Sequence, residues 1–530
     1  MKFLRGKNKY PEAEQRNESI SDAEACPLEA NLETMLYKIK QELGDSPDLV
    51  TRSFEIGSTP SIPVRVVYIS GLADEQAINE YIIRALMVDT AESKLEIDCN
   101  HVFDLILNNA LTIGDVAVLT DWNELIFSIL SGDTIILIEG HAKAIASSTK
   151  GGQWRAITES TTQVNIRGPK DSFNESIATN IALVRRHLKS PKLRLETMRI
   201  GNVSQTNVAI MYLKGIVSDE LLQEVRQRLT DIKIDAVLDS GYLEELIQDQ
   251  TLTPFPTIYN TERPDVISGN LLEGRIAVLV DGTPFTLIVP TIFSQFFQAS
   301  EDYYQRYDIV VLMRLIRYTS FFILLLGPSF YIAVTTYHPE MLPTALLINI
   351  MAQREGVPFP AFIEAVIMEA TFEVLREAGI RMPRAVGQAV SIVGAIVLGQ
   401  AAVEAGVVTG LMVIVVAITG IASFAIPAYN LTIAARMIRF PLMIISAVLG
   451  FYGMTLALIL LVAHMNSLRS FGIPYLAPFT PFSLKGQKDT VIRAPFKSYV
   501  TQSRVIDQTN AENTQTQTDE LKSSASESRK

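Results

Sequence analysis

The feature that most constrains this chain is an apolar second half behind a polar first half. Residues 318–464 consist largely of apolar side chains, and Tyr318–Tyr337 is an uninterrupted run without any charge. A helix of about 20 apolar residues is long enough to cross the hydrocarbon core of a bilayer. The sequence therefore predicts an α-helical polytopic membrane domain that follows an α/β N-terminal region.

The apolar half, residues 311–465, predicts about five membrane helices. The expected segments are Tyr318–Tyr337, the short Met341–Ala352, the pair Val386–Val403 and Val407–Ile426, and Leu442–Ala463. Residues 360–378 carry several glutamates and predict an amphipathic helix at the membrane interface. Because Met341–Ala352 fits either a short span or a re-entrant segment, counting spans leaves the side of the C-terminal tail open.

Arginines gather beside the predicted spans. Arg314 and Arg317 precede the first span, Arg381 and Arg384 precede another, and Arg436 and Arg439 precede the last. The latter two clusters are typical of cytoplasmic loops in membrane proteins. The first residues lack the apolar core of a secretory signal peptide, so we expect the large N-terminal region to lie in the cytoplasm.

The polar half predicts two small α/β modules, residues 51–160 and 161–310. Apolar runs predict strands at 62–70, 115–119, 134–139, 142–148, 193–200, 208–213, 276–280 and 284–289. Asp281-Gly282 is the expected tight turn between the last two strands. Residues 1–50 are predicted to be mobile apart from an amphipathic helix at 29–44, and 466–530 to be disordered after about residue 500.

The sequence offers no catalytic, cofactor-binding or metal-binding constellation. Gly269–Arg275 resembles a phosphate-binding loop, but Arg275 and Ile276 stand where that loop needs the lysine and the hydroxyl residue that hold phosphate and Mg²⁺. Cys26, Cys99 and the five histidines form no metal-ligand pattern. A net charge of −11 argues against nucleic-acid binding. We therefore expect a protein that is not an enzyme and carries no cofactor.

Two loops carry charges that could contact a partner protein. Arg167 and Lys170 lie beside a predicted helix start, and Arg263 and Asp265 lie in a second loop. The first loop could dock an anion or an acidic partner surface. The alternatives are a solvated turn for the first loop and a local ion pair that closes the second.

The helix predicted at 386–404 has two distinct faces. One face carries Val386, Val390, Val393, Val397, Gln400 and Glu404, and the opposite face carries Gly387, Ser391, Ala395 and Gly399. Small residues at four-residue spacing let helices pack closely in lipid. Valine rings that end in an amide and a carboxylate predict a pore lined by Val390, Val393, Val397, Gln400 and Glu404. The alternative is that Glu404 is hydrated at the lipid headgroups and the stripe serves helix packing.

Several blocks of the sequence match a known family. The membrane blocks are Leu326–Tyr337, Phe362–Pro383 and Ala385–Asn430, and the soluble blocks are Gly168–Asn174, Asn180–Leu188, Asp239–Leu246, Phe255–Asp265 and Gly282–Pro290. In this order they resemble the GerA-type spore germination protein family, A subunit of a nutrient germinant receptor. The resemblance runs from about residue 50 to about residue 480.

The resemblance implies an integral protein of the inner membrane of the spore, with its N-terminal domain on the cytoplasmic side. The implied partners are a B-type permease-like subunit, a C-type lipoprotein subunit, membrane lipid and further copies of the chain. The implied function is to convert nutrient sensing by a partner into ion release that starts germination, as a proposed nutrient-gated ion channel. A membrane scaffold that does not conduct and a solute carrier are the alternatives. The carrier is less favoured because the predicted spans hold no buried pair of ionisable residues.

Overall fold

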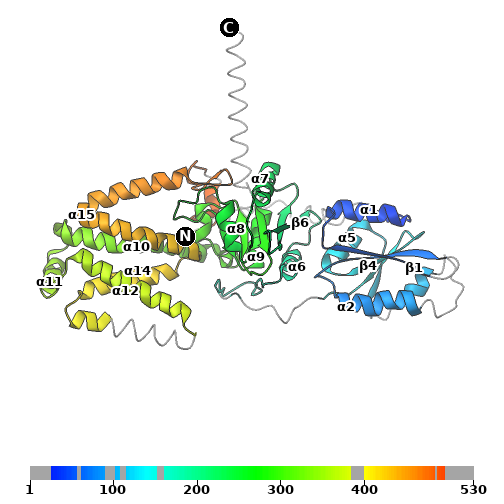
Figure 1. The fold of residues 1–530 in the computed structure, drawn as a ribbon, viewed down its shortest axis with the longest axis horizontal. Helices are drawn as coiled ribbons and strands as arrows, with labels where there is room; N and C mark the ends of the chain where they lie inside the picture. Colours follow the sequence, from blue (N-terminus) through cyan, green and yellow to red (C-terminus); the bar gives the residue numbers. More distant parts are fainter. Residues whose placement is uncertain are drawn as a thin grey trace, which may run out of the picture. The chain divides into compact units, whose positions relative to one another are not determined.

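The computed structural model describes residues 26–56, 61–89, 102–107, 115–151, 160, 162–383, 399–483 and 486–495 (Figure 1). The chain divides into two compact units. The first comprises residues 1–157, 176–198 and 209–214, and the second comprises 158–175, 199–208 and everything from Gly215 onward.

The first unit is built on an antiparallel sheet in the order β1-β2-β4-β5-β3. Its strands are β1 (Leu49–Ile56), β2 (Ile62–Ile69), β3 (Val116–Leu119), β4 (Thr134–Ile138) and β5 (Ala144–Ser147). Side chains alternate between the two faces of a strand. Val67 and Ile69 of β2 therefore join the core beneath α1 (Leu32–Leu43) and α5 (Trp122–Ser131). Val64 and Val66 join the core on the other face, beneath the helical turns of Glu75–Asp89 and α4 (Val102–Leu105).

The second sheet has the order β6-β7-β9-β10-β8. Its strands are β6 (Leu193–Ile200), β7 (Thr206–Leu213), β8 (Tyr259–Thr261), β9 (Ile276–Val280) and β10 (Thr286–Val289), and the helices along this stretch are α6 (Ile177–His187), α7 (Asp219–Thr230), α8 (Ser240–Ile247) and α9 (Pro264–Leu272). The hairpin predicted across Asp281-Gly282 is confirmed, since β9 and β10 pair antiparallel and Gly282 has a φ of 91°. These elements give the N-terminal half the expected α/β class.

The apolar half forms a bundle of helices in the second unit. Its described helices are α10 (Tyr307–Thr336), α11 (Thr344–Glu355), α12 (Ala361–Arg381), α14 (Gly410–Phe424) and α15 (Tyr429–Ser467). Among the described residues, α10 and α15 are long and apolar enough to cross a membrane. Large apolar side chains such as Phe322, Ile459 and Leu460 are exposed on them, as expected for surfaces that face lipid.

Helix α15 is in fact two helices joined at Gly450. Gly450 has φ 59° and ψ −144°, far from helical values. Beside this turn, the hydroxyl of Tyr337, which follows α10, donates to the carbonyl of Ala447 at 2.9 Å. At 1.5 Å per residue the two halves are about 32 and about 26 Å long. The length of each half is therefore close to the thickness of the hydrocarbon core of a bilayer, about 30 Å.

The two halves of α15 run antiparallel. Near the start of α15, Asn430 Nδ2 donates to Glu244 Oε1 of α8 at 3.4 Å. Near its end, His464 Nε2 lies 3.0 Å from Thr253 Oγ1, in the loop that follows α8. Both ends of α15 therefore contact the second α/β region, and its middle lies at the opposite end of the bundle. We call these the near end and the far end of the bundle.

Two expectations from the sequence are corrected here. Leu442–Ala463 is not one span, because the chain reverses at Gly450. Residues 360–378 do not form an interfacial helix, because α12 packs among α10, α14 and α15 with Glu364 and Glu369 fully buried. The sequence does not show that a glycine within an apolar run reverses the chain, and it does not show which residues surround a glutamate on an apolar helix.

Replacing Gly450 by alanine is expected to lower the free energy of unfolding by about 1–3 kcal/mol. The backbone there is strained for an L-residue, and a Cβ would lie 3.0 Å from the Tyr337 ring. Thermal unfolding of the detergent-solubilised protein, followed by circular dichroism, measures the loss. Gly269→Ala is the control, because a Cβ at that position meets no atom within 4 Å. Equal stability of the two variants would contradict a turn at Gly450.

Candidate functional site

The predicted pore stripe is described at its last two positions. Val390, Val393 and Val397 lie outside the described residues. Gln400 and Glu404 are both exposed, and Gln400 Nε2 donates to Glu404 Oε1 at 2.8 Å. The two side chains therefore share one helix face, one turn apart, while their place on a pore stays a prediction.

The small face predicted for helix packing is described at one position. Gly387, Ser391 and Ala395 lie outside the described residues. Gly399 is buried, and a Cβ there would lie 3.6 Å from Val413 Cγ1 of α14. Gly399 thus lies against α14, and the packing role of the whole face stays a prediction.

The two charged loops have different surroundings. Arg167 and Lys170 are exposed. Arg263 and Asp265 are buried and pair with each other at 2.8 Å, and Arg263 also donates to the Pro169 carbonyl at 2.8 Å. This is the local ion pair that the sequence left open as an alternative. Partner contact through either loop stays a prediction.

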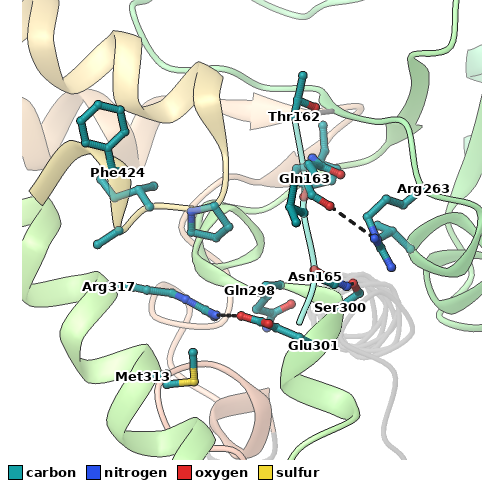
Figure 2. Close-up of a pocket in the computed structure, with 17 residues that line it drawn as sticks. Thr162, Gln163, Asn165, Arg263, Gln298, Ser300, Glu301, Met313, Arg317 and Phe424 are labelled. Atoms are coloured by element: carbon teal, nitrogen blue, oxygen red, sulfur yellow. Dashed lines mark hydrogen bonds and ion pairs between the residues drawn. The ribbon is translucent and has the colours of Figure 1, made fainter. Parts of the chain in front are cut away.

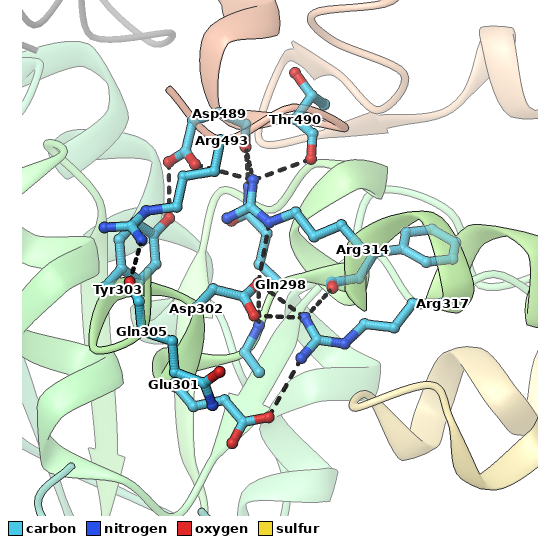
Figure 3. Close-up of polar contacts among 12 residues, drawn as sticks. Gln298, Glu301, Asp302, Tyr303, Gln305, Arg314, Arg317, Asp489, Thr490 and Arg493 are labelled. Atoms are coloured by element: carbon cyan, nitrogen blue, oxygen red, sulfur yellow. Dashed lines mark hydrogen bonds and ion pairs between the residues drawn. The ribbon is translucent and has the colours of Figure 1, made fainter. Parts of the chain in front are cut away.

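A buried charge cluster lies at the near end of the bundle, around Asp302 (Figure 3). Asp302 is 1% exposed and accepts from Arg314 Nε at 3.0 Å and from Arg317 Nη1 at 2.8 Å on each oxygen. Arg314 Nη1 also donates to Asp489 Oδ1 at 3.0 Å. We call Asp302, Arg314, Arg317 and Asp489 the Asp302 cluster. It joins the first turns of α10 to a segment that follows the last helix.

Tyr303 and Arg493 extend the Asp302 cluster, each through one hydrogen bond. Tyr303 Oη donates to Asp489 Oδ2 at 2.8 Å, and Arg493 Nη1 donates to the Gln305 carbonyl at 2.9 Å. Desolvation, together with the charge of Asp489, raises the pKa of the Tyr303 phenol well above its usual value. The phenol therefore remains a donor at physiological pH. Residues 486–495 are held at the near end by these bonds, so this segment and the start of α10 lie on the same side of the bundle.

A second buried charge cluster lies inside the bundle, between α12 and α15. Arg439, 1% exposed, lies 2.7 Å from Glu369 Oε2 and 3.3 Å from Glu373 Oε1. Arg436 lies 3.1 Å from Glu373 Oε2. We call Glu369, Glu373, Arg436 and Arg439 the Arg439 cluster. Charges buried among membrane helices are costly unless they are paired, and they mark functional or conformational sites more often than other positions do.

A third polar contact ties α12 to the start of α14 at the far end. Glu364 is fully buried, and its Oε1 accepts from the backbone N–H of Thr409 at 2.5 Å and from the Thr409 hydroxyl. Thr409 is the N-cap of α14, since its hydroxyl accepts from Met412 N at 3.2 Å. A carboxylate at a helix N-terminus is stabilised by the helix dipole. This contact positions the turn that directly follows Glu404.

A cavity of about 400 Å³ lies beside the Asp302 cluster (Figure 2). Its lining includes three segments far apart in sequence, namely residues 162–165, the start of α10 with Arg317, and the end of α14 with Phe424, together with residues 298–301 and the region of Tyr259 and Arg263. Arg317 lies 3.4 Å from Glu301 across its floor. The segment 162–165 therefore shares this cavity with α10 and α14.

These buried clusters hold segments of the chain in position. Among the described residues there is no group of three or more acidic, histidine or cysteine side chains placed to hold a metal ion. Sequence reasoning identified Arg314, Arg317, Arg436 and Arg439 only as flanking charges, and it missed Asp302, Glu369 and Asp489 as their partners. No local signal distinguishes these acids, because other charged residues such as Glu301, Glu373 and Lys488 lie close to them in the sequence.

The fold defines a protein whose helical bundle is joined to an α/β region, and two of its described helices are long and apolar enough to indicate a membrane protein. Residues 37–505 match the family of Bacillus/Clostridium GerA spore germination proteins. Spore germination protein KA of Bacillus subtilis (strain 168) is 50% identical over 88% of this chain and 85% of its own length. The chain therefore belongs to the GerA spore germination protein family.

Other relatives and one solved structure are similar over long stretches. Spore germination protein GerLA of Bacillus cereus is 40% identical over 88% of this chain and 94% of its own length. An uncharacterized membrane protein of Bacillus subtilis (strain 168), YfkQ, is 42% identical over 92% of this chain and 94% of its own length. The crystal structure of the N-terminal domain of the A subunit of the Bacillus megaterium spore germinant receptor GerK3 is 44% identical, covers 51% of this chain and 98% of that chain, and has a TM-score of 0.41.

Proposed function

We propose that this chain is the A subunit of a spore germinant receptor in the inner membrane of the spore. In this proposal it assembles with further copies of itself, with a B-type permease-like subunit and with a C-type lipoprotein. The assembly converts nutrient sensing by a partner into ion release. Family membership supports the receptor role, since spore germination proteins are similar to this chain over most of its length.

The proposed orientation places both α/β regions on the cytoplasmic side of the membrane. Arg314 and Arg317 lie at the near end of the bundle, and Arg436 lies in the half of α15 that begins there. Positive charges are enriched on the cytoplasmic side of membrane helices. The segment 486–495 is bound at the same end, so the proposal also places that segment in the cytoplasm.

The observation that carries the channel proposal is the exposed pair of Gln400 and Glu404. Glu404 is the only charged side chain from Ala385 to Ala435, and it accepts a hydrogen bond from Gln400. A carboxylate in lipid costs roughly 2.5–3.5 kcal/mol even on the lower scales. A water-filled path between copies of the chain removes that cost and gives the pair a role in attracting cations.

We propose that the conformational change that gates the channel involves the near end of the bundle. The cavity beside the Asp302 cluster is lined by the segment 162–165 together with α10 and α14. A partner that binds more tightly to one arrangement of these segments shifts the population toward it. Thr409, tied to Glu364 at the far end of α14, follows Glu404 by five positions, so a movement of α14 would be transmitted to the proposed stripe.

Ion flux through liposomes that contain the assembled receptor tests this proposal. Glu404→Gln is expected to reduce nutrient-dependent cation flux about tenfold, because a ring of carboxylates concentrates cations at the pore. Val397→Ala is expected to make flux independent of nutrient, because it widens a proposed constriction. Val403→Ala is the matched control, since Val403 lies one position from Glu404 and off the predicted stripe; it should leave flux unchanged.

The other outcomes discriminate the alternatives. No flux under any combination, from receptor shown to be assembled, would support a scaffold and contradict the channel. Saturable uptake of an organic solute by this chain alone would support a carrier. Equal flux in wild type, Glu404→Gln and Val397→Ala would place the pore elsewhere.

A further inference from the structure

A second cavity, of about 580 Å³, lies at the near end of the bundle. It is bounded by α8 and β8 of the second sheet region, by the end of α12 at Ile380, and by the turn that leads from Pro427 into α15. Its volume lies in the range of pockets that enclose small organic molecules, roughly 300–1,000 Å³. Neither the residues of the Asp302 cluster nor the described residues of the proposed pore stripe are among its lining residues.

The charged side chains among the described lining residues of this cavity are acidic. Asp239 and Glu244 line it, and no lysine, arginine or histidine is among its described lining residues. Glu244 is held by two amides, accepting from Asn260 Nδ2 at 3.1 Å and from Asn430 Nδ2 at 3.4 Å. The amides orient the carboxylate without neutralising it. Burial raises the pKa of Glu244, a hydrogen bond from Asn260 lowers it, and the charge of Asp239 raises it further.

The rest of the cavity supplies an apolar and aromatic lining. Tyr259, Phe285, Phe296 and Tyr429 contribute to its wall. Aromatic rings attract a cation through their negative faces, and the attraction grows when the cation is withdrawn from water. Carboxylates next to aromatic rings, without a competing basic side chain, form the chemistry that recognises a protonated amine.

We propose that this cavity is a binding site for an organic cation, a protonated amine that carries an apolar or aromatic body. Glu244 is the principal anionic partner, Asp239 adds negative charge at the start of α8, and the aromatic wall encloses the body of the ligand. The ligand would contact the end of α12, the turn at Pro427 and the first turn of α15 at once.

Direct binding to the full-length protein in lipid nanodiscs tests the site. The probe is phenethylammonium, compared by calorimetry with its neutral isostere 2-phenylethanol and with the anion phenylacetate at equal ionic strength. We expect one phenethylammonium per chain, bound at least tenfold more tightly than either isostere. Glu244→Gln is expected to weaken phenethylammonium at least tenfold, because the amide keeps the shape and loses the charge.

Two further variants separate charge in the cavity from charge elsewhere. Asp239→Asn removes the second carboxylate and keeps an efficient N-cap for α8, so binding should weaken several-fold in a protein that remains folded. Glu245→Gln removes an exposed carboxylate on the same helix that does not line the cavity, and binding should be unchanged. Equal affinity for phenethylammonium and 2-phenylethanol, unchanged binding by Glu244→Gln, or a Kd weaker than ~1 mM would overturn the site.

A link between this site and the helices rests on the proposed function and is measured separately. If the link exists, phenethylammonium changes nutrient-dependent flux in wild-type liposomes and not in Glu244→Gln liposomes. Binding without any change in flux would remove the link and leave the site. Absent binding with intact nutrient-dependent flux would overturn the site and leave the proposed function standing.

Discussion

Replacing Asp302 by asparagine is expected to lower the free energy of unfolding by about 3–5 kcal/mol. Asp302 is the shared partner of Arg314 and Arg317, which are 0% and 5% exposed. Asparagine keeps the size of the side chain but removes its negative charge. Its amide N–H donors would then face two guanidinium groups, which are themselves only donors. Chemical denaturation of the detergent-solubilised protein, with the transition followed by near-ultraviolet circular dichroism, measures the change.

The control for Asp302→Asn is Asp308→Asn, which removes a carboxylate of the same type six positions later. Asp308 pairs with Arg306 at 3.0 Å, but both side chains are about half exposed or more. An exposed pair of this kind contributes less than about 1 kcal/mol. Similar losses from the two variants would mean that the Asp302 cluster is not buried in the folded protein.

Replacing Arg439 by methionine is expected to destabilise the bundle by about 3–5 kcal/mol, because Glu369 is left charged and fully buried. Arg439 lies 2.7 Å from Glu369, although neither oxygen of Glu369 makes an aligned hydrogen bond within the described structure. The contact is therefore an ion pair, and its loss cannot be offset by a remaining hydrogen bond. The thermal midpoint of unfolding in detergent reports the effect.

A double variant distinguishes the loss of the ion pair from the loss of packing. Arg439→Met combined with Glu369→Leu removes both charges, and it should recover most of the stability lost by Arg439→Met alone. Arg381→Gln is the control, because Arg381 and its partner Glu377 are 78% and 55% exposed; it should change stability by less than about 1 kcal/mol. A double variant as unstable as the sum of its single variants would show that Arg439 and Glu369 do not interact.

The strands that sequence patterns predicted best are those buried on both faces. The runs at 62–70 and 276–280 become β2 and β9, whose residues are mostly buried; β9 is apolar throughout, and β2 is apolar apart from Arg65, so both runs stand out from their surroundings. Strand β1 was missed because its sequence, LVTRSFEI, is half exposed at the edge of the sheet. Its register is fixed by pairing with β2, and pairing leaves no mark on the sequence of an edge strand.

The helical bundle shows a different limit. Apolar length predicted α10 and the last apolar segment, but it could not show that Gly450 reverses the chain, because glycine is frequent within continuous membrane helices. The hydroxyl of Tyr337 donates to a carbonyl beside this turn, and the two residues lie 110 positions apart in the sequence.

The polar stripe and the charge clusters differ in how visible they are in the sequence. Gln400 and Glu404 lie four residues apart, so helical periodicity alone places them on one face. Arg439 and Glu369 are 70 positions apart, and Arg314 is 175 positions from Asp489. Such partners are set by tertiary packing, so the candidate site could be predicted only where it follows one helix.

The separation of Arg314 from Asp489 also has a consequence for synthesis of the chain. At roughly 5–20 residues per second, the ribosome adds those 175 residues in roughly 9–35 s. For most of that interval α10 has been synthesised in full, while the second acid that pairs with Arg314 has not been made. The Asp302 cluster is therefore completed only after both halves of α15 have been translated, and a chain that stops before Asp489 has only one of the two acidic partners of Arg314.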